Sequence, residues 1–574
     1  MQILFQLRSR RIIFSGIVFA AYATLVWLIG HSMVTHGNPF TFVDGLGNIG
    51  LGIISFIIFF IIEMVLSLIF LRAKAIKLRD SKHTYQWLTY LGVIILLWLP
   101  YIVLAFPGVI GWDGADQLNG IFRSNMPAQN IHFYGTVFNY AHQQFYLTNH
   151  HPLLTSLFLG GLYWLGYVGL KSAYFGVAII TLVQALLLGT ALAYLVSTIS
   201  TLGKRSGWFV ISFFGLFPIF PILVVNVNKT AIFLITLVFF FGALIRLMLK
   251  QSKFSDQLIL LVSGVCLVLV RNDSFLLLFT AIFVFLIFRL PLKQLLATFA
   301  TALFVFAIWS KVLLPALHVE PTESVEALAL PSQQIVYTLK HKPEAFSAQS
   351  KHKLAKLADL KLMTMSYTNG AYDPIKHTYY YYPDGFFVAG KSYTQRMAMI
   401  KAAPINAHKA WFWSIWLEGL KNAPSMYINA FIRNYYHYQY FGDRRINFDL
   451  GFAGAGFVPY EDSKLFADFN NLPTEGQKRL ATFMLNLQNF VPTNILLTTG
   501  FWGLTTVLLT FISFALKNKF ALAFSIMALS TIAVGFLSPV DGYLRYVLPV
   551  MLTIPMTIML LSGTNTLKVN DGGN

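Results

Sequence analysis

The chain has 574 residues, of which 56% are hydrophobic, 16% are aromatic and only 11% are charged, and its mean hydropathy is +0.63. Soluble domains carry about 25% charged residues, so this composition excludes a soluble globular protein and predicts a polytopic membrane protein. The net charge of +19 does not indicate nucleic-acid binding, because no basic patch is interleaved with aromatic residues and membrane proteins concentrate Lys and Arg in cytoplasmic loops.

Twelve apolar stretches are candidates for membrane spans, since a span needs about 20 residues and short buried helices need fewer. They lie near residues 12–30, 49–71, 86–106, 173–199, 208–225, 230–248, 257–270, 274–289, 294–314, 494–515, 520–537 and 545–562. The first stretch follows Arg8, Arg10 and Arg11 and lacks a small-residue cleavage site, so we expect a retained span. The predicted fold class is an all-α polytopic membrane protein with about 12 transmembrane helices plus juxtamembrane helices.

The distribution of basic residues predicts the orientation. The N-terminal arginines place the N-terminus in the cytoplasm. Loop 31–48 has no Lys or Arg and is expected outside, whereas loop 72–85 has five and is expected inside, so residues 107–150 lie outside. We therefore expect a multi-pass cell-membrane protein with both termini cytoplasmic. Five later basic clusters should also lie inside: Lys204/Arg205, Arg246/Lys250/Lys253, Arg289/Lys293, Lys517/Lys519 and Lys568.

The apolar segment 152–169 conflicts with this orientation if it crosses the membrane. A crossing there, followed by another at 173–199, would place Lys204/Arg205 outside and invert every later cluster. The segment is rich in glycine and starts directly after His150-His151-Pro152. We therefore predict a re-entrant or surface-lying helix on the outer side, which is tolerated where it lines a cavity.

Polar residues gather on the outer side in residues 106–152, directly after a predicted span. Asp113 and Asp116 would share one helix face if a helix begins at Asp113, which can also serve as its N-cap. Beyond capping, such a carboxylate can act as a general base or hold a divalent cation. His150 and His151 suit hydrogen bonds to a phosphate or a sugar better than zinc binding, because adjacent imidazoles do not readily face one metal.

Three short outer turns each carry a lone cation between apolar helices: Lys229, Arg271 and Arg545. Each of them alone is explained by snorkelling at the membrane interface. Together, on the same side as Asp113, they favour a shared anion site. The chain contains no P-loop, no Gly-x-Gly-x-x-Gly before a strand and no Gly-x-Ser-x-Gly, so an outer-face enzyme would need a donor that is already in the membrane.

Residues 316–490 lack a clean span and are predicted to form a mostly helical extracytoplasmic domain. Within it, residues 351–357 are a basic run typical of a solvated helix face, and the tyrosines at 379–382 suit sugar faces or the membrane interface. Residues 404–442 are predicted to form amphipathic helices on the bilayer. The predicted organisation is a transmembrane module (1–315) with an outer catalytic loop at 107–172, then this domain, then C-terminal transmembrane helices (491–574).

Several of these patches together resemble the GT-C glycosyltransferases, polytopic enzymes that use polyprenyl-phosphate-linked sugars, and in particular their uncharacterised bacterial members with an Asp followed by Asn-His-His-Pro. The patches that carry the resemblance are Asp113 and Asp116 in Gly-Trp-Asp-Gly-Ala-Asp-Gln, Asn149-His150-His151-Pro152-Leu153-Leu154, the long helix 173–199 leading to Lys204-Arg205, Pro-x-x-Tyr-Ile-x-Ala-Phe at 424–431, and Arg545-Tyr546.

The resemblance implies a GT-C-like fold and a glycosyltransferase of the outer membrane face. Asp113 would be the catalytic base, and the donor-phosphate cations would correspond by location to Lys229, Arg271 and Arg545. Many members have an Asp-Glu pair, whereas Gly114 follows Asp113 here, so the role of Asp116 as a second acid stays open. A divalent cation stays open with it, and no cofactor is otherwise implied.

The implied partners are a polyprenyl-phosphate-linked sugar, membrane lipid and an envelope glycan or glycolipid acceptor, with His150 and His151 at the substrate. A transporter or flippase of a lipid-linked precursor is the main alternative; it would place ionisable groups at mid-membrane and often show paired halves. A non-catalytic scaffold is the third reading, and it predicts that Asp113 is replaceable.

Overall fold

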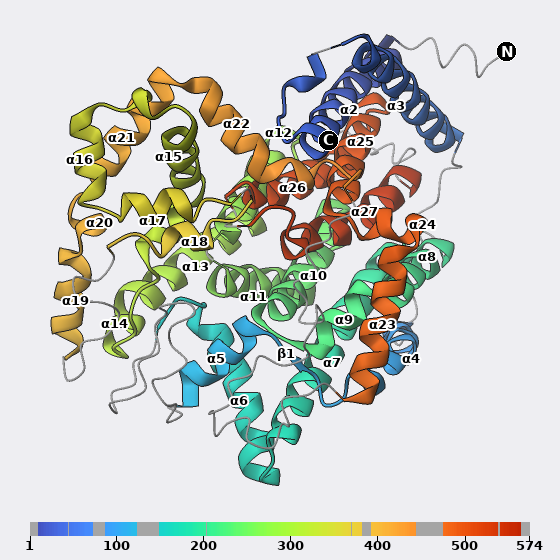
Figure 1. Cartoon of the computed structure of the whole chain (residues 1–574). Helices are drawn as coiled ribbons and strands as arrows, with labels where there is room; N and C mark the ends of the chain where they lie inside the picture. Colours follow the sequence, from blue (N-terminus) through green and yellow to red (C-terminus); the bar gives the residue numbers. More distant parts are fainter. Residues whose placement is uncertain are drawn as a thin grey trace.

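The computed structural model of the chain is built almost entirely of helices (Figure 1). The structure describes residues 10–43, 45–72, 86–122, 148–202, 204–271, 273–368, 370–380, 392–443, 474–537 and 540–563. Within these residues the regular strands are β1 (Val109–Ile110) and β2 (Asn226–Val227).

Residues 324–438 are named the outer segment, after the side of the membrane predicted for them. The helices before this segment form most of the apolar body. They are α2 (Arg10–His36), η1 (Thr41–Val43), α3 (Leu46–Arg72), α4 (Gln86–Ala105), α5 (Trp112–Phe122), α6 (Leu153–Leu170), α7 (Ala173–Ser200), α8 (Lys204–Leu216), α9 (Ile219–Val225), α10 (Lys229–Met248), α11 (Phe254–Val270), α12 (Ser274–Ile287), α13 (Lys293–Ile308), η4 (Trp309–Leu313) and α14 (Leu314–Ala316). The C-terminal helices complete this body: α23 (Glu475–Asn489), α24 (Val491–Leu497), α25 (Thr499–Ala515), α26 (Lys519–Gly535) and α27 (Leu544–Gly563).

The apolar helices define a multi-pass membrane protein, but they do not confirm twelve spans. In the described residues, seven helices are long and apolar enough to cross a bilayer, and up to nine if each of two bent pairs counts as one span. The bent pairs are α8 with α9 and α24 with α25. Three predicted spans, at 257–270, 274–289 and 520–537, correspond to α11, α12 and α26, which have 17, 14 and 17 residues and are shorter than a typical span of about 20 residues.

The core of the body lies around α7 and α10, whose side chains are buried on nearly every face. A helix that is apolar all round is expected at such a central position. α7 packs against α4, α6 and α10. The indole of Trp98 on α4 is fully buried, and its Nε1 donates to the carbonyl oxygen of Phe214 on α8 at 3.0 Å. This bond satisfies a polar group that would otherwise be costly in an apolar core.

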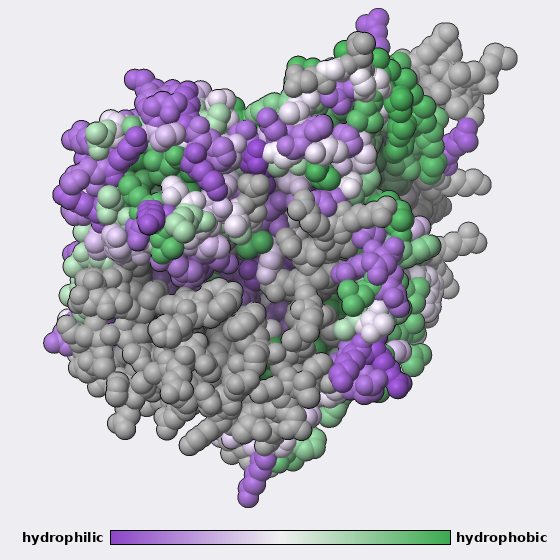
Figure 2. All heavy atoms as spheres, viewed as in Figure 1, coloured by the Kyte–Doolittle hydropathy of each residue, from purple (hydrophilic) through white to green (hydrophobic). Residues whose placement is uncertain are grey.

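The outer segment has a hydrophobic core of its own, which includes the fully buried Tyr372 and Phe412. Its elements are η5 (Ser324–Leu328), α15 (Ala329–His341), η6 (Pro343–Ala345), α16 (Ala348–Ala355), α17 (Leu360–Met365), α18 (Asp373–Lys376), α19 (Tyr393–Ala402), α20 (Pro404–Ala407), α21 (Lys409–Asn422), α22 (Pro424–Tyr435) and η7 (Tyr436–Tyr438). Figure 2 shows hydrophilic side chains over much of this segment, whereas apolar side chains cover α3.

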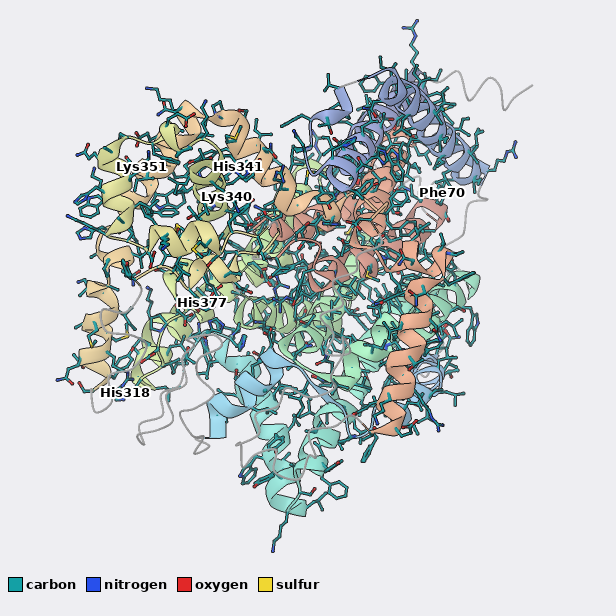
Figure 3. The ribbon with its side chains drawn as sticks, in the orientation of Figure 1. Phe70, His318, Lys340, His341, Lys351 and His377 are labelled. Atoms are coloured by element: carbon teal, nitrogen blue, oxygen red, sulfur yellow. The ribbon has the colours of Figure 1, made fainter. Side chains whose placement is uncertain are left out.

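The basic run at 351–357 lies mostly on α16, where Leu354 and Leu357 are buried and His352 is exposed. Figure 3 shows Lys351 on this helix and Lys340 and His341 on α15, well apart from α5. The run is therefore a helix face with its apolar side in the core of the outer segment, as the sequence predicts.

α23 packs against α4 rather than in the core of the outer segment. Its buried Gln477 donates through Nε2 to the carbonyl oxygens of Ala105 and Gly108, each at 3.1 Å. These two carbonyls flank the chain as it leaves α4 and enters β1, so α23 fixes the direction in which that chain approaches the polar stretch.

Candidate functional site

A two-residue parallel strand pair brings two distant helix starts together. β1 pairs with β2 in the register Val109 to Asn226 and Ile110 to Val227. α5 begins two residues after β1, and α10 begins two residues after β2. Because parallel strands run in the same direction, the first turns of α5 and α10 lie side by side. This pairing is what carries Asp113 next to Lys229.

Gly114 allows α5 to lie directly against β2. A Cβ atom at this position would be 1.9 Å from the carbonyl oxygen of Val227, far inside van der Waals contact. Glycine is the residue that permits such close approach of two backbones. A side chain of any size, including that of glutamate, therefore has no room at position 114.

The carboxylate of Asp113 contacts two cations. Arg545 on the first turn of α27 donates from Nη1 to Asp113 Oδ2 at 2.9 Å, and Lys229 Nζ lies 3.4 Å from the same oxygen. The side chains of Asp113, Lys229 and Arg545 are 32%, 22% and 18% exposed. The contact is therefore half-buried, where charge interactions are stronger than at an open surface.

Asp113 is ionised in contact with these two cations. Burial by itself disfavours the charged form, but the charges of Lys229 and Arg545 outweigh burial and hold the pKa of Asp113 well below its usual value. A carboxylate with so low a pKa is a weak base while both cations stay in contact with it.

His151 lies on the other side of Lys229. Its Nδ1 is 2.7 Å from Lys229 Nζ, and the side chain is buried. Burial and the positive charge of Lys229 lower the pKa of His151 well below its usual value, so the ring is neutral. Because the ammonium can only donate, Nδ1 must accept and the ring proton must sit on Nε2. That Nε2 is buried and has no hydrogen-bond partner in the described structure, which leaves a donor for a ligand.

The third predicted cation, Arg271, lies beside this cluster but has its own counter-ion. Its guanidinium is paired with Asp273 through two nitrogens. It also lies 5.3 Å from the ring centre of Tyr546, while Arg545 lies 5.4 Å from the same ring. Arg271 lines a small open cavity whose walls come from α10, α12, α26 and α27.

His150 faces away from Asp113's contacts toward the outer segment. Its Nδ1 is 2.8 Å from Glu323 Oε2, and burial, which would lower its pKa, is outweighed by Glu323, which raises it. His150, Glu323 and Glu326 offer ligand atoms within 4.8 Å of one another and so could hold a divalent cation. Lys376, however, already lies 2.8 Å from Glu326 Oε1 and supplies positive charge there.

The remaining predicted acid, Asp116, lies one turn further along α5, and its side chain is outside the described part of the chain.

The sequence led to Asp113, His151, Lys229 and Arg545, which the structure brings into contact, with Arg271 adjacent. It missed Glu323, because nothing local in the sequence links it to His150, 173 residues away. It also missed Gln184, whose Nε2 donates to the carbonyl oxygens of Val224 and Asn226 at 3.0 Å each and so holds the start of β2.

The described chain is thus a helical, multi-pass membrane protein with a half-buried cluster of one carboxylate, two cations and a neutral histidine. It belongs to DUF6020, a family of unknown function, whose model matches residues 19–570. Comparisons with curated proteins and with solved structures gave no match.

Proposed function

We propose that this protein is a GT-C-type glycosyltransferase that moves a sugar from a polyprenyl-phosphate donor to a cell-envelope acceptor on the outer membrane face. The observation that carries the proposal is the contact of the Asp113 carboxylate with Lys229 and Arg545, which come from distant parts of the chain. Transfer of a sugar away from a phosphate needs a base for the acceptor hydroxyl and cations for the leaving phosphate, and the cluster combines both.

The charge balance of the cluster favours an anionic ligand. Lys229 and Arg545 carry two positive charges against one negative charge on Asp113, and His151 is neutral. One positive charge is therefore in excess in a half-buried site, where a phosphate would be attracted. Arg271 is balanced by Asp273 and contributes a hydrogen-bonding guanidinium rather than net charge.

Binding of the donor would also strengthen Asp113 as a base. A phosphate in contact with Lys229 and Arg545 adds negative charge near Asp113 and offsets the effect of the two cations, so its proton affinity rises. Asp113 then takes the proton of the acceptor hydroxyl while the acceptor oxygen bonds to the anomeric carbon. The bond from that carbon to the phosphate oxygen breaks, and its electron pair leaves with the phosphate. A single displacement of this kind inverts the configuration at the sugar.

The surroundings of the cluster support a lipid-linked donor. The cavity beside Arg271 opens between α10, α12, α26 and α27, and its walls include Phe233, Leu277 and Val534. This cavity is too small to hold a lipid tail, but an apolar chain lying across its opening would have its phosphate near Arg271 and Arg545. The Nε2–H of His151 is available to a sugar or phosphate oxygen.

One observation favours the alternative that the protein is a transporter: the carboxyl group of Glu63 lies inside the apolar helix α3. It is fully buried, its Oε1 accepts from Ser15 and Ser67, and its Oε2 has no partner in the described residues. Ionisable groups inside membrane helices commonly mark transport pathways. This reading predicts that Glu63→Gln stops lipid translocation across vesicles, whereas the transferase proposal predicts no such movement in the parent protein.

Asp113→Asn tests the proposal in full-length protein reconstituted in vesicles with a polyprenyl-phospho-sugar and cell-envelope material. We expect sugar transfer, measured as release of polyprenyl phosphate, to fall about 10²- to 10⁴-fold, the usual loss for a general base. Asp359→Asn is the matched control, since Asp359 caps α17 in the outer segment, and it should keep the parental rate. Parental activity in Asp113→Asn would refute the catalytic role.

A further inference from the structure

The turn that precedes Arg545 is held by the outer segment. The backbone N–H of Asp541 donates to the carbonyl oxygen of Gly370 at 2.7 Å, and Val540 forms an isolated bridge with Ala371. Gly370 is itself fixed, because its N–H donates to Asn434 Oδ1 on α22 at 2.8 Å. The outer segment therefore contacts the chain four residues before the guanidinium that reaches Asp113.

His437 on η7 lies between two carboxylates at this contact. Its Nε2 is 3.0 Å from Asp443 Oδ2, and its Nδ1 is hydrogen-bonded to Asp541 Oδ2. Both carboxylates are buried, and the histidine side chain is 19% exposed. Ionised carboxylates only accept hydrogen bonds, so the ring must carry a proton on each nitrogen to satisfy both. The geometry thus selects the imidazolium form.

The turn is packed tightly against this ring. Gly542 has a φ of +64°, and a Cβ atom there would be 2.9 Å from the Cβ of His437. The hydroxyl of Thr499 on α25 also lies beside Gly542, and it donates to the carbonyl oxygen of His437 at 2.8 Å. Movement of the turn therefore requires His437 to move or to release Asp541, and Arg545 follows three residues after Gly542.

We propose that the imidazolium of His437, clamped between Asp443 and Asp541, is a protonation-dependent latch that sets the position of Arg545 in the anion site. His437 is a positioning residue that acts through Asp541 and the turn 540–543. The latch itself rests on geometry alone, whereas its effect on anion binding rests on the proposed function. Its consequence is that the outer segment controls how much positive charge faces the donor phosphate.

The pH range of the latch follows from the groups around the ring. Burial would lower the pKa of His437, but its hydrogen bonds to Asp443 and Asp541 raise it to about 9. The pKa lies above that of free histidine, near 6.5, so the stabilising proton is fully present below about pH 6.5 and is lost as the pH rises through about 9. Burial raises the pKa of Asp541 to about 6, so its carboxylate is charged throughout that loss. Among the described residues around the contact, the phenols Tyr435, Tyr436, Tyr438 and Tyr440 are also titratable, and Tyr438 donates to the carbonyl oxygen of Val540 at 3.1 Å.

Thiol labelling tests the latch without any substrate. In full-length protein with Cys266→Ala, a thiol introduced by Val540→Cys reports opening of the turn to a methanethiosulfonate reagent. We expect slow labelling at pH 7, about ten-fold faster labelling above pH 9, and fast labelling at both pH values once His437→Gln is added, because exposure tracks local opening. Rates are divided by those of Ser414→Cys, an exposed position on α21, to remove the intrinsic effect of pH on thiols.

Two matched variants keep this test decisive. His341→Gln, which changes a histidine of α15 whose Nδ1 is hydrogen-bonded to the carbonyl oxygen of Tyr337, should label like the parent. Asp541→Asn keeps the volume of the side chain and breaks the ionic contact, so it should also label fast. It replaces His437→Gln in the test if that variant does not fold. Parental rates and parental pH dependence in either folded latch variant would overturn the proposal.

A double-mutant cycle then asks whether the latch acts through Arg545. Pyrophosphate is the test anion, with binding measured by calorimetry on the full chain in detergent. We expect His437→Gln to weaken binding about ten-fold in the parent but less than about two-fold when Arg545→Gln is already present, because two steps of one interaction are not additive. Additive losses would show that His437 does not act through Arg545. Failure of the parent to bind pyrophosphate would instead count against the proposed function and leave the labelling result intact.

Discussion

The contact between Asp113 and its cations depends on how closely one residue, Gly114, lets α5 approach β2. The Cα of Gly114 lies against the carbonyl of Val227, in a space that excludes any side chain. A methyl group there must push the strand and helix apart, and Asp113 would move with the helix. The residue next to the proposed base thus sets the distance from that base to Lys229.

Gly114→Ala should therefore destabilise the protein by about 1–3 kcal/mol, the usual cost of forcing extra volume into a packed site. The measurement is the thermal unfolding temperature in detergent, which should fall by several degrees. Gly161→Ala is the control, because a Cβ on this exposed face of α6 meets no atom within 4 Å and alanine favours helix. Equal unfolding temperatures for the two variants would contradict the close approach at Gly114.

At the scale of elements, the pair of β1 and β2 depends on a side chain from α7. Gln184 is fully buried and donates to two carbonyl oxygens that end α9 and begin β2. These two bonds help to satisfy the backbone oxygens of the chain between α9 and α10 in an apolar core. The side-chain amide of Gln184 therefore donates hydrogen bonds to the backbone beside β2, as a neighbouring strand would.

Gln184→Leu should cost about 1–3 kcal/mol, since it removes both of these buried hydrogen bonds. Unfolding in a graded denaturant series would measure the loss. Gln257→Leu, near the start of α11 and at the other end of the α10–α11 pair, should change stability little. A loss no larger than that of Gln257→Leu would mean that the strand pair does not need the amide.

At this scale, the sequence predicts structure that depends on neighbouring residues better than contacts between residues far apart in the chain. Apolar stretches fix most helices, because burial acts on every residue of a run. The apolar runs also predicted α11, α12 and α26, with each end within three residues of its position in the structure. The pairing of β1 with β2 could not be predicted, because two-residue strands leave no periodic pattern in the sequence. His437 and Asp541 are 104 residues apart in the chain, and only tertiary contacts bring them together.

At the scale of the whole molecule, the remaining question is the side of the membrane on which α6 ends. The proposed site needs the loop before α6 on the outer face. The predicted orientation further requires α6 to return there before α7 crosses. α6 packs along α5 and α7 and has exposed apolar side chains at Trp164 and Leu165, as expected of a helix that lies partly in lipid.

Ser172→Cys, between α6 and α7, tests this topology in a Cys266→Ala background. We expect a membrane-impermeant maleimide to label it in intact cells. Ser252→Cys is the matched control, since it lies in the turn between α10 and α11 that is predicted to be cytoplasmic and is similarly half-buried. It should be labelled only after permeabilisation. Labelling of Ser172→Cys only from the cytoplasm would refute the re-entrant arrangement of α6.

The two cations on Asp113 become available at different times during synthesis of the chain. Lys229 is synthesised soon after Asp113, but Arg545 follows 432 residues later, on the last described helix. During synthesis the carboxylate therefore meets one cation first and the second only when α27 has entered the membrane and docked on α10 and α26. The excess positive charge that would attract a lipid phosphate arises with that final docking. A ribosome-bound chain would have the base but not the anion site, so a nascent protein would not capture donor before its fold is complete.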